Sequence, residues 1–430
     1  MLSSTFLTWL FAAALVLSLA VKLWLTTRQM RHVAAHRHTV PAAFADGVSL
    51  ATHQHAADYT LAKGRFGLLA SAFGSLLLLG WTLLGGLDAL NIAVRNAVQP
   101  SLGNMAYQLT LLLAFALIGG LLDLPFEIYS TFRIEAQFGF NRNTWPLYVA
   151  DTAKGLLLGA LIGLPLAALV LWIMGVAGPL WWLWAWGAWT AFQLLMLLAY
   201  PTLIAPLFNK FEPLADEALK ARVQALMQRC GFAAKGLFVM DGSRRSAHGN
   251  AYFTGLGATK RVVFFDTLLA KLSAPEVEAV LAHELGHFKH RHITQRMLMM
   301  FLASLAGLAL LGWLTRQTGF YQGLGAQPNL QAPNDALALL LFMIALPVFG
   351  FFVSPLMAQL SRKHEFQADA YASAQASATD LASALLKLHK DNAATLTPDP
   401  LYVRFYYSHP PASERLAALL PQAAPAPLAA

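Results

Sequence analysis

The feature that most constrains this chain is a series of long apolar segments. A helix needs about 20 predominantly apolar residues to cross the hydrocarbon core of a bilayer. Segments that meet this criterion cover residues 5–26, 66–88, 107–129, 153–176, 179–200, 296–315 and 335–357. Because 57% of the residues are hydrophobic and only 12% are charged, a soluble fold would expose much of this apolar surface. The sequence therefore predicts a mainly α-helical, multi-pass membrane protein with about seven transmembrane helices.

Basic residues between the apolar segments predict how the chain is oriented in the membrane. The connection between the first two segments carries a cluster of them: Arg28, Arg31, Arg37, Lys63 and Arg65. The next connection carries only Arg95. Since Arg and Lys are enriched in cytoplasmic loops, the first, third and fifth connections and the C-terminus are expected in the cytoplasm. The expected location is the inner membrane of a bacterium or the endoplasmic reticulum membrane of a eukaryote.

Charge and cysteine content exclude several other classes of protein. The formal net charge is +8, but no dense basic run or basic–aromatic motif accompanies it. The excess positive charge is therefore attributed to cytoplasmic loops, so the expected partners include the lipid bilayer around the spans and do not include nucleic acid. The single cysteine, Cys230, can form neither an intrachain disulfide nor a cysteine-rich zinc module.

The alternation of apolar and polar stretches predicts the domain organisation. Five parts are expected: a transmembrane domain with five spans (1–200), a cytoplasmic domain (201–295), two further spans (296–357), a C-terminal segment of soluble composition (358–420) and a disordered Pro/Ala-rich tail (421–430). Within the cytoplasmic domain a helix is predicted from Asp216 to Arg229. Short strands are predicted at 237–240, 250–254 and 261–265.

The strongest chemical signal is the motif His283-Glu284-Leu285-Gly286-His287. Its helix is predicted to begin after Ser273, with Glu276 completing a capping box. On this helix His283 and His287 lie one turn apart on the same face. Two imidazoles at this spacing can bind one zinc ion, and Glu284 between them can act as general base on a metal-bound water.

A catalytic zinc site needs a third protein ligand and an open position for water. Glu365 is the best candidate, and Asp369, four residues later, lies on the same helix face. Asp369 can accept the second N–H group of a ligand histidine and so fix its orientation. His364 is the competing ligand, although it points about 100° away from Glu365 around the helix. Taken alone, the two carboxylates are equally compatible with a solvated helix.

Several separated motifs resemble the type I CAAX prenyl endopeptidases, which are membrane zinc proteases that process prenylated proteins. The resemblance extends over nearly the whole chain and rests on these segments: Arg28-Gln29, 135–141 (EAQFGFN), 204–214 (IAPLFNKFEPL), 248–255 (HGNAYFTG), the HELGH helix, 361–369 and 408–416 (SHPPASERL). It implies a bundle of seven spans that encloses a chamber. It also implies a gluzincin-like zinc protease domain with a small β-sheet at the cytoplasmic end.

The resemblance also implies a role for each matching residue. One zinc ion per chain is implied at His283, His287 and Glu365, with Glu284 as base and Asp369 in support of the ligands. His409 is implied to stabilise the oxyanion that develops on the substrate. Asn250, Ala251 and Tyr252 fall in a segment implied to be an edge strand, with which a peptide substrate could pair by β-augmentation.

Two alternative functions stay open on the sequence alone. The first is a quality-control protease of membrane or misfolded proteins that resembles the HtpX-type enzymes. The second is a metal transporter or sensor, which predicts ionisable residues in the middle of spans. The first connection also contains five histidines that could form a metal-binding loop: His32, His36, His38, His53 and His55.

Overall fold

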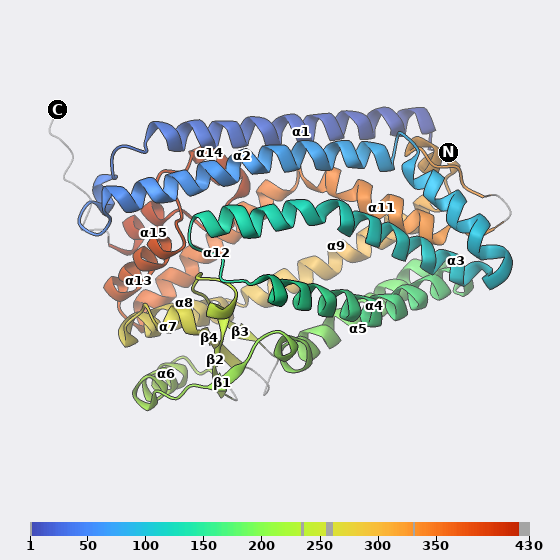
Figure 1. The fold of residues 1–430 in the computed structure, drawn as a ribbon. Helices are drawn as coiled ribbons and strands as arrows, with labels where there is room; N and C mark the ends of the chain where they lie inside the picture. Colours follow the sequence, from blue (N-terminus) through green and yellow to red (C-terminus); the bar gives the residue numbers. More distant parts are fainter. Residues whose placement is uncertain (1, 234–235, 255–260, 330–331, 421–430) are drawn as a thin grey trace.

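The structure, a computed structural model, describes residues 2–233, 236–254, 261–329 and 332–420. The predicted disordered tail, 421–430, lies outside the described residues. The chain is mainly α-helical (Figure 1). Its first half contains α1 (Ser4–Ala35), α2 (Leu50–Trp81), α3 (Gly86–Tyr129), α4 (Trp145–Val176) and α5 (Trp181–Ala199). The later helices are α6 (Glu217–Arg229), α7 (Asp266–Leu269), α8 (Ala274–Lys289), α9 (His292–Leu314), α10 (Thr318–Gly323), α11 (Asp335–Gly350), α12 (Ser354–Gln375), α13 (Ala378–Asp391), α14 (Pro400–Tyr406) and α15 (Ala412–Leu419).

The predicted number of spans is confirmed. Six helices in the described part of the chain are long and apolar enough to cross a membrane, and α11 with α12 makes a seventh if this bent pair counts as one span. The last predicted span, 335–357, is not one straight helix, because α11 ends at Gly350 and α12 leaves it at an angle of 64°. Pro347 removes one helical hydrogen bond near the end of α11, and Pro355 fits the first turn of α12. The chain therefore changes direction before it reaches Glu365.

The connection between the first two spans is largely helical, contrary to the prediction of a histidine-rich loop. α1 extends to Ala35 and contains His32, whereas α2 begins at Leu50 and contains His53 and His55. Ser49 caps α2 by accepting a hydrogen bond from the Thr52 N–H group, which explains this early start. In the described residues these five histidines form no group suited to a metal ion.

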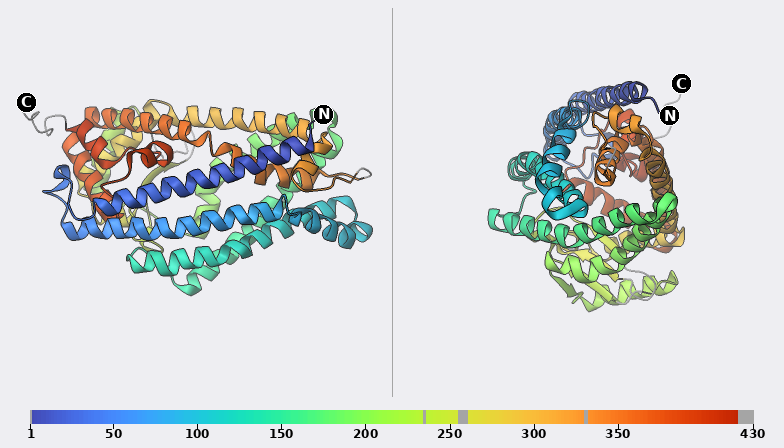
Figure 2. Two further views of the ribbon diagram at one scale, coloured as in Figure 1. Left: turned by 90° about the horizontal axis from the view of Figure 1, so that it is seen from above. Right: turned by 90° about the vertical axis from the view of Figure 1, so that its right-hand side faces the viewer.

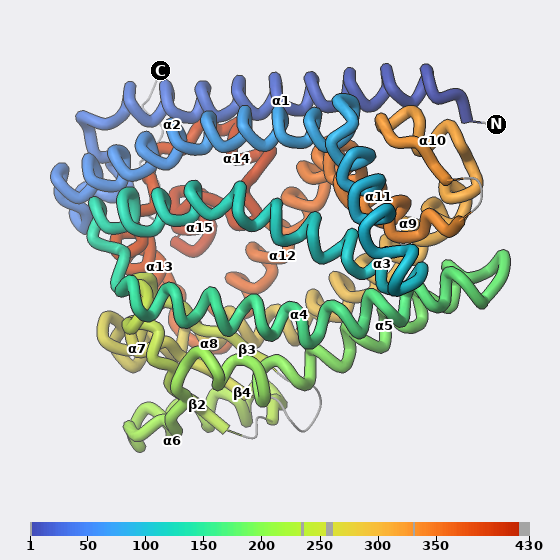
Figure 3. The backbone as a smooth tube through the Cα atoms, turned by 45° about the vertical axis from the view of Figure 1, so that its right-hand side comes forward, coloured from blue at the N-terminus to red at the C-terminus, as the bar shows by residue number. Residues whose placement is uncertain are grey.

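The long helices lie side by side along one axis of the molecule, and the catalytic elements gather at one end (Figure 1). Viewed end-on, the long helices are arranged as a ring (Figure 2). α10 lies against the first turns of α1 at the end far from the catalytic elements (Figure 3). There the Thr8 hydroxyl donates to the Gly323 carbonyl at 2.9 Å. The chamber implied by the resemblance stays a prediction.

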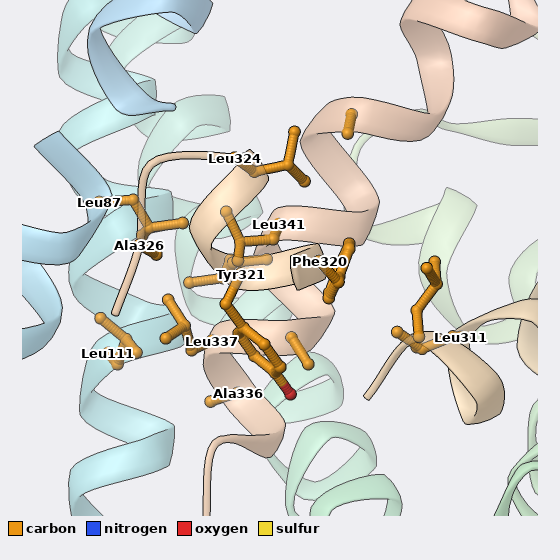
Figure 4. Packing of buried hydrophobic residues seen from close by; sticks show 14 of the residues in the cluster. Leu87, Leu111, Leu311, Phe320, Tyr321, Leu324, Ala326, Ala336, Leu337 and Leu341 are labelled. Carbon is orange, nitrogen blue, oxygen red and sulfur yellow. The ribbon is translucent and has the colours of Figure 1, made fainter. Parts of the chain in front are cut away.

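A compact apolar core holds the spans together at this far end. Leu311 of α9, Phe320 and Tyr321 of α10, and Leu337 and Leu341 of α11 are almost completely buried against one another (Figure 4). Helices that pack in lipid gain little from the hydrophobic effect and depend on close side-chain contact. The core therefore fixes the relative positions of the helices from which the catalytic segments continue.

A four-stranded sheet forms the other part of the catalytic end. Its strands are β1 (Phe211–Pro213), β2 (Gly236–Met240), β3 (Ala251–Thr254) and β4 (Arg261–Phe265), in the order β1-β2-β4-β3. The three predicted strands are confirmed to within one residue, and β1 was not predicted. β2 and β4 are parallel, and β3 is an edge strand paired antiparallel to β4. Phe264 of β4, Leu281 of α8 and Leu226 of α6 share one buried cluster, which attaches the sheet to the motif helix.

Candidate active site

The helix that carries the HELGH motif is fixed at its first turn. The Ser273 N–H group donates to the Glu276 carboxylate at 2.7 Å, which confirms the predicted capping box. The same carboxylate accepts from the Ser383 hydroxyl at 2.6 Å and from the Lys387 ammonium at 2.8 Å. Burial opposes ionisation, but these hydrogen bonds outweigh it and lower the pKa of Glu276 to about 2. The start of α8 is thereby attached to α13.

A close helix crossing brings the third candidate ligand to the motif. α12 packs across α8 where Gly286 faces Ala368. A Cβ atom on Gly286 would lie 2.9 Å from the Ala368 Cα atom, closer than side chains tolerate. Glycine at this position of the motif therefore allows the two backbones to approach. One turn before Ala368, Glu365 reaches the histidine pair on α8.

The ligand atoms of His283, His287 and Glu365 lie within 4.8 Å of one another. His283 Nε2 is 3.4 Å from Glu365 Oε2, and His287 Nε2 is 3.5 Å from Glu365 Oε1. Two ligands about 2.0–2.1 Å from an ion and at the tetrahedral angle are separated by roughly 3.4 Å. Glu365 Oε2 is buried without a hydrogen-bond partner, which a cation would satisfy. The three side chains therefore fit a small divalent metal ion.

His364 points away from this group, as its position on the helix predicts. Its ring stacks on that of His292 with 3.9 Å between the centroids and an interplanar angle of 9°. It does not belong to the metal-binding group found in the described residues. The geometry therefore favours Glu365 over His364 as the third ligand.

Asp369 and Arg415 hold His283 on the side of its ring that faces away from the other two ligands. His283 Nδ1 is 2.7 Å from Asp369 Oδ1, so its Nε2 atom faces the other two ligands. Arg415 donates two hydrogen bonds to Asp369, of 2.5 and 2.7 Å, and is itself 6% exposed. Burial disfavours the imidazolium, but the carboxylates of Asp369 and Glu365 outweigh it and raise the pKa of His283 to about 9. A metal ion that binds His283 Nε2 must displace the proton that this nitrogen carries in the imidazolium.

A second histidine and a glutamine hold the other ligand. The Gln367 amide oxygen lies 2.9 Å from His292 Nε2 and can only accept, so this nitrogen carries the proton. His292 Nδ1 is then an acceptor, and it lies 3.0 Å from His287 Nδ1. The proton of His287 is therefore on Nδ1, and its Nε2 atom is free to bind a metal. His292, Gln367 and Arg415 were not predicted as functional residues, although His292 follows the motif by only five residues.

The candidate base and the candidate oxyanion donor both reach the same cavity, which has a volume of about 570 Å³. Burial is the main cause that raises the pKa of Glu284. His409 is largely exposed, and its Nε2 atom lies 3.5 Å from Glu365 Oε1. The prolines that follow it, Pro410 and Pro411, are buried in the cavity wall and restrict the backbone beside it.

The predicted substrate strand reaches the cavity only in part. Asn250 and Ala251 line the cavity, whereas Tyr252 does not. Tyr252 instead packs edge-on against Phe265 of β4, with 6.2 Å between ring centroids. Among the described strands β3 lies at the edge of the sheet, which is the position from which a strand can pair with an extended peptide.

The segment EAQFGFN fixes the chain just before that strand. The Phe140 carbonyl accepts a hydrogen bond from the Ala247 N–H group at 3.1 Å, and the Phe140 ring stacks on His248 with 4.5 Å between centroids. Glu135 accepts from the Tyr59 hydroxyl at 2.6 Å and lies 3.7 Å from His248 Nε2. The membrane domain therefore holds the approach to Asn250 in place.

Long apolar spans and a largely buried His-His-Glu group on a HELGH helix are the features expected of a membrane-embedded metallopeptidase. Residues 29–210 match the family described as CAAX prenyl protease N-terminal, five membrane helices, and residues 213–423 match peptidase family M48. The chain therefore belongs to peptidase family M48, and it is a metalloendopeptidase that acts on peptides or proteins.

This chain matches known relatives and a solved structure over almost its entire length. The chain is 34% identical to CAAX prenyl protease 1 of Saccharomyces cerevisiae, over 92% of this chain and 91% of that protein. It is 32% identical to the CAAX prenyl protease 1 homolog of Homo sapiens, over 95% of each. The crystal structure of S. mikatae Ste24p superposes with a TM-score of 0.89 at 31% identity, covering 96% of this chain and 99% of that one. These matches support the resemblance read from the motifs over the HtpX-type and transporter alternatives.

Proposed function

We propose that this protein is a zinc endopeptidase that cleaves prenylated substrates near their C-terminus. The observation that carries the zinc assignment is the group of His283, His287 and Glu365, whose separations suit tetrahedral coordination. Two nitrogen ligands and one carboxylate, with a cavity on the open side, are typical of a catalytic rather than a structural zinc site. The substrate assignment is supported by the relatives named CAAX prenyl protease 1.

The residues around the metal position divide the reaction among them. Bound there, zinc would lower the pKa of a coordinated water towards about 7 and polarise the scissile carbonyl. Glu284 takes a proton from the attacking water and delivers it to the leaving amine. The imidazole of His409 donates to the oxygen on which negative charge develops. Asp369 and His292 keep His283 and His287 in the orientation that the metal requires.

The cavity offers two kinds of contact to a peptide. The outer side of β3 at Asn250 and Ala251 can supply main-chain hydrogen bonds. α13 contributes an apolar wall from Leu381, Leu385 and Leu388. Main-chain pairing is independent of sequence, so selectivity must come from the side chains around the cavity.

The direct test uses the purified full-length protein and two peptides that differ only in a farnesyl group on one cysteine. Chelation should abolish hydrolysis of both peptides, and about one equivalent of zinc per chain should restore it. The farnesylated peptide should have the higher kcat/KM. Hydrolysis that continues in verified metal-free protein would contradict the zinc assignment. Equal kcat/KM for the two peptides would contradict the prenyl assignment alone.

We further propose that the catalytic end faces the cytoplasm and that the chain divides at residues 200, 295, 357 and 420. The basic residues between α1 and α2 and around α8 support this orientation. The change from one family match to the next, between residues 210 and 213, supports a boundary close to the first division.

A reporter inserted within α6 should read as cytoplasmic, whereas one inserted near Arg95 should read as external. A second reporter after Leu420 serves as an internal control, because it must agree with the α6 insertion. An external signal from α6 would place the catalytic site outside the cytoplasm and reverse the proposed topology.

A further inference from the structure

A single arginine on α9 enters the catalytic cavity without belonging to the metal site. Arg296 lies on the second turn of α9 and lines the same cavity as His283, Glu284 and His409. Its side chain is exposed rather than packed into the protein. A positively charged group in a substrate cavity costs little free energy only when it stays solvated or pairs with an anion.

The guanidinium of Arg296 is only partly used within the protein. Its hydrogen bond goes to the neutral Ser361 hydroxyl at 3.0 Å, and across the described ranges it forms no ion pair. The other arginine of the cavity wall, Arg415, is by contrast buried and fully engaged with Asp369. A guanidinium has five N–H donors in a planar fork, so most of those on Arg296 remain available.

The position of Arg296 gives the cavity two chemically different ends. α13 is attached to the first turn of α8 through Glu276, so Leu381 and Leu385 lie beside the N-terminal half of the motif helix. α9 follows the C-terminal end of α8 after a sharp turn at Arg291, where φ is 57°. The metal ligands therefore lie between an apolar end and a basic end.

Arg296 also lies near the reacting groups, because Arg296, Glu284 and His287 all line the same cavity. An anion bound at Arg296 would thus be close to the catalytic centre.

We propose that Arg296 binds a carboxylate of the peptide substrate, at the end of the cavity opposite the leucines of α13. The proposal rests on the function above, because it requires that the cavity binds peptides. A carboxylate matches the two parallel N–H donors of a guanidinium, and such charge-assisted pairs are stronger than neutral hydrogen bonds. The carboxylate can be the free C-terminus of the substrate or the side chain of an aspartate or glutamate.

The test compares matched peptides on full-length protein. One pair differs only in a C-terminal acid or amide, and a second, amidated series exchanges Glu for Gln at each position near the scissile bond. In the natural protein one of these carboxylates should raise kcat/KM by about 10–100-fold, the range expected for a hydrogen-bonded charge pair. The pair that responds identifies the source of the carboxylate.

The ratio of kcat/KM for the charged peptide to kcat/KM for its uncharged partner should fall close to one in Arg296→Gln. Arg296→Lys should keep a ratio between one and the natural value, because Lys keeps the charge but not the planar fork of N–H donors. Arg316→Gln, the same change just beyond the C-terminal end of α9, is the matched control and should leave the ratio unchanged. Ratios near one in the natural protein, or ratios that Arg296→Gln does not alter, would overturn the proposal. A loss of kcat/KM that is equal for all peptides and occurs only in the presence of anionic lipid would also overturn the proposal. In that case Arg296 would contact the membrane surface and not the substrate. The proposed function is tested separately by the uncharged peptide, whose hydrolysis should stop when the metal is chelated.

Discussion

Glu284→Gln should abolish peptide hydrolysis while the protein keeps its metal and its fold. The amide has almost the same shape as the carboxylate but cannot accept the proton of the attacking water. Removal of a general base typically lowers the rate by about 10²–10⁴-fold. Glu284 lies on the cavity wall and is not one of the three converging ligands, so the metal content should not change. The measurement is kcat together with zinc content per chain.

His409→Ala provides a graded comparison in the same assay. It should also keep the metal, but lower kcat by about 10²–10³-fold, as expected for loss of an oxyanion donor, with little effect on KM. His409→Phe should not restore activity, because it replaces the bulk of the ring and not its N–H group. Loss of zinc from Glu284→Gln would identify Glu284 as a ligand. Near-normal kcat in His409→Ala would remove His409 from the reaction.

Glu365→Ala should remove the metal and, with it, all measurable activity. The substitution takes away one of three protein ligands and leaves His283 and His287 without their common partner. Loss of a residue that only supports a ligand costs about 10–100-fold in metal affinity, so loss of a ligand should cost at least about 100-fold. Competition between the protein and a chelator of known affinity measures this change directly.

The adjacent histidine offers a matched control for this experiment. His364→Ala removes a similarly buried side chain from the same turn of α12, but one that stacks on His292 and does not face the metal position. It should leave zinc affinity within a few-fold of the natural value. If His364→Ala alone loses the metal, the ligand assignment is wrong. Asp369→Asn should fall between the two variants, because it weakens the support of His283 only.

Local sequence patterns were sufficient for the elements that depend on near neighbours. A span needs about 20 apolar residues, so the number of spans follows from composition along the chain. The capping box at Ser273 and Glu276, and the spacing of His283 and His287, both depend on helix geometry within a single element. These features are present in the structure as predicted.

Boundaries were harder to predict where a helix continues beyond the membrane. α2 begins at Leu50, well before its apolar stretch, because Ser49 caps it and no residue up to Arg65 breaks it. The bend in the last span was not predicted, because apolar character continues through Phe351 to Met357 while the chain changes direction after Gly350. Hydropathy reports burial in lipid and does not show where a helix changes direction.

The composition of the site was decided by contacts between distant segments. The sequence offered Glu365 and His364 as rival ligands. The α8–α12 crossing at Gly286 and Ala368 selects the side of α12 that meets the histidine pair. The support of His287 by His292 and Gln367, and of Asp369 by Arg415, could not be predicted, because each involves side chains that only the folded chain brings together.

The sequence by itself therefore determined which chemical groups the protein has and on which helices they lie. Periodicity, capping and hydropathy act over a few turns, and each can be read within one segment. Only the tertiary structure decided which groups meet, since that depends on the bend after Gly350, the crossing at Gly286 and the attachment of α13 to Glu276. The same packing gives the cavity an apolar end at α13 and a basic end at Arg296.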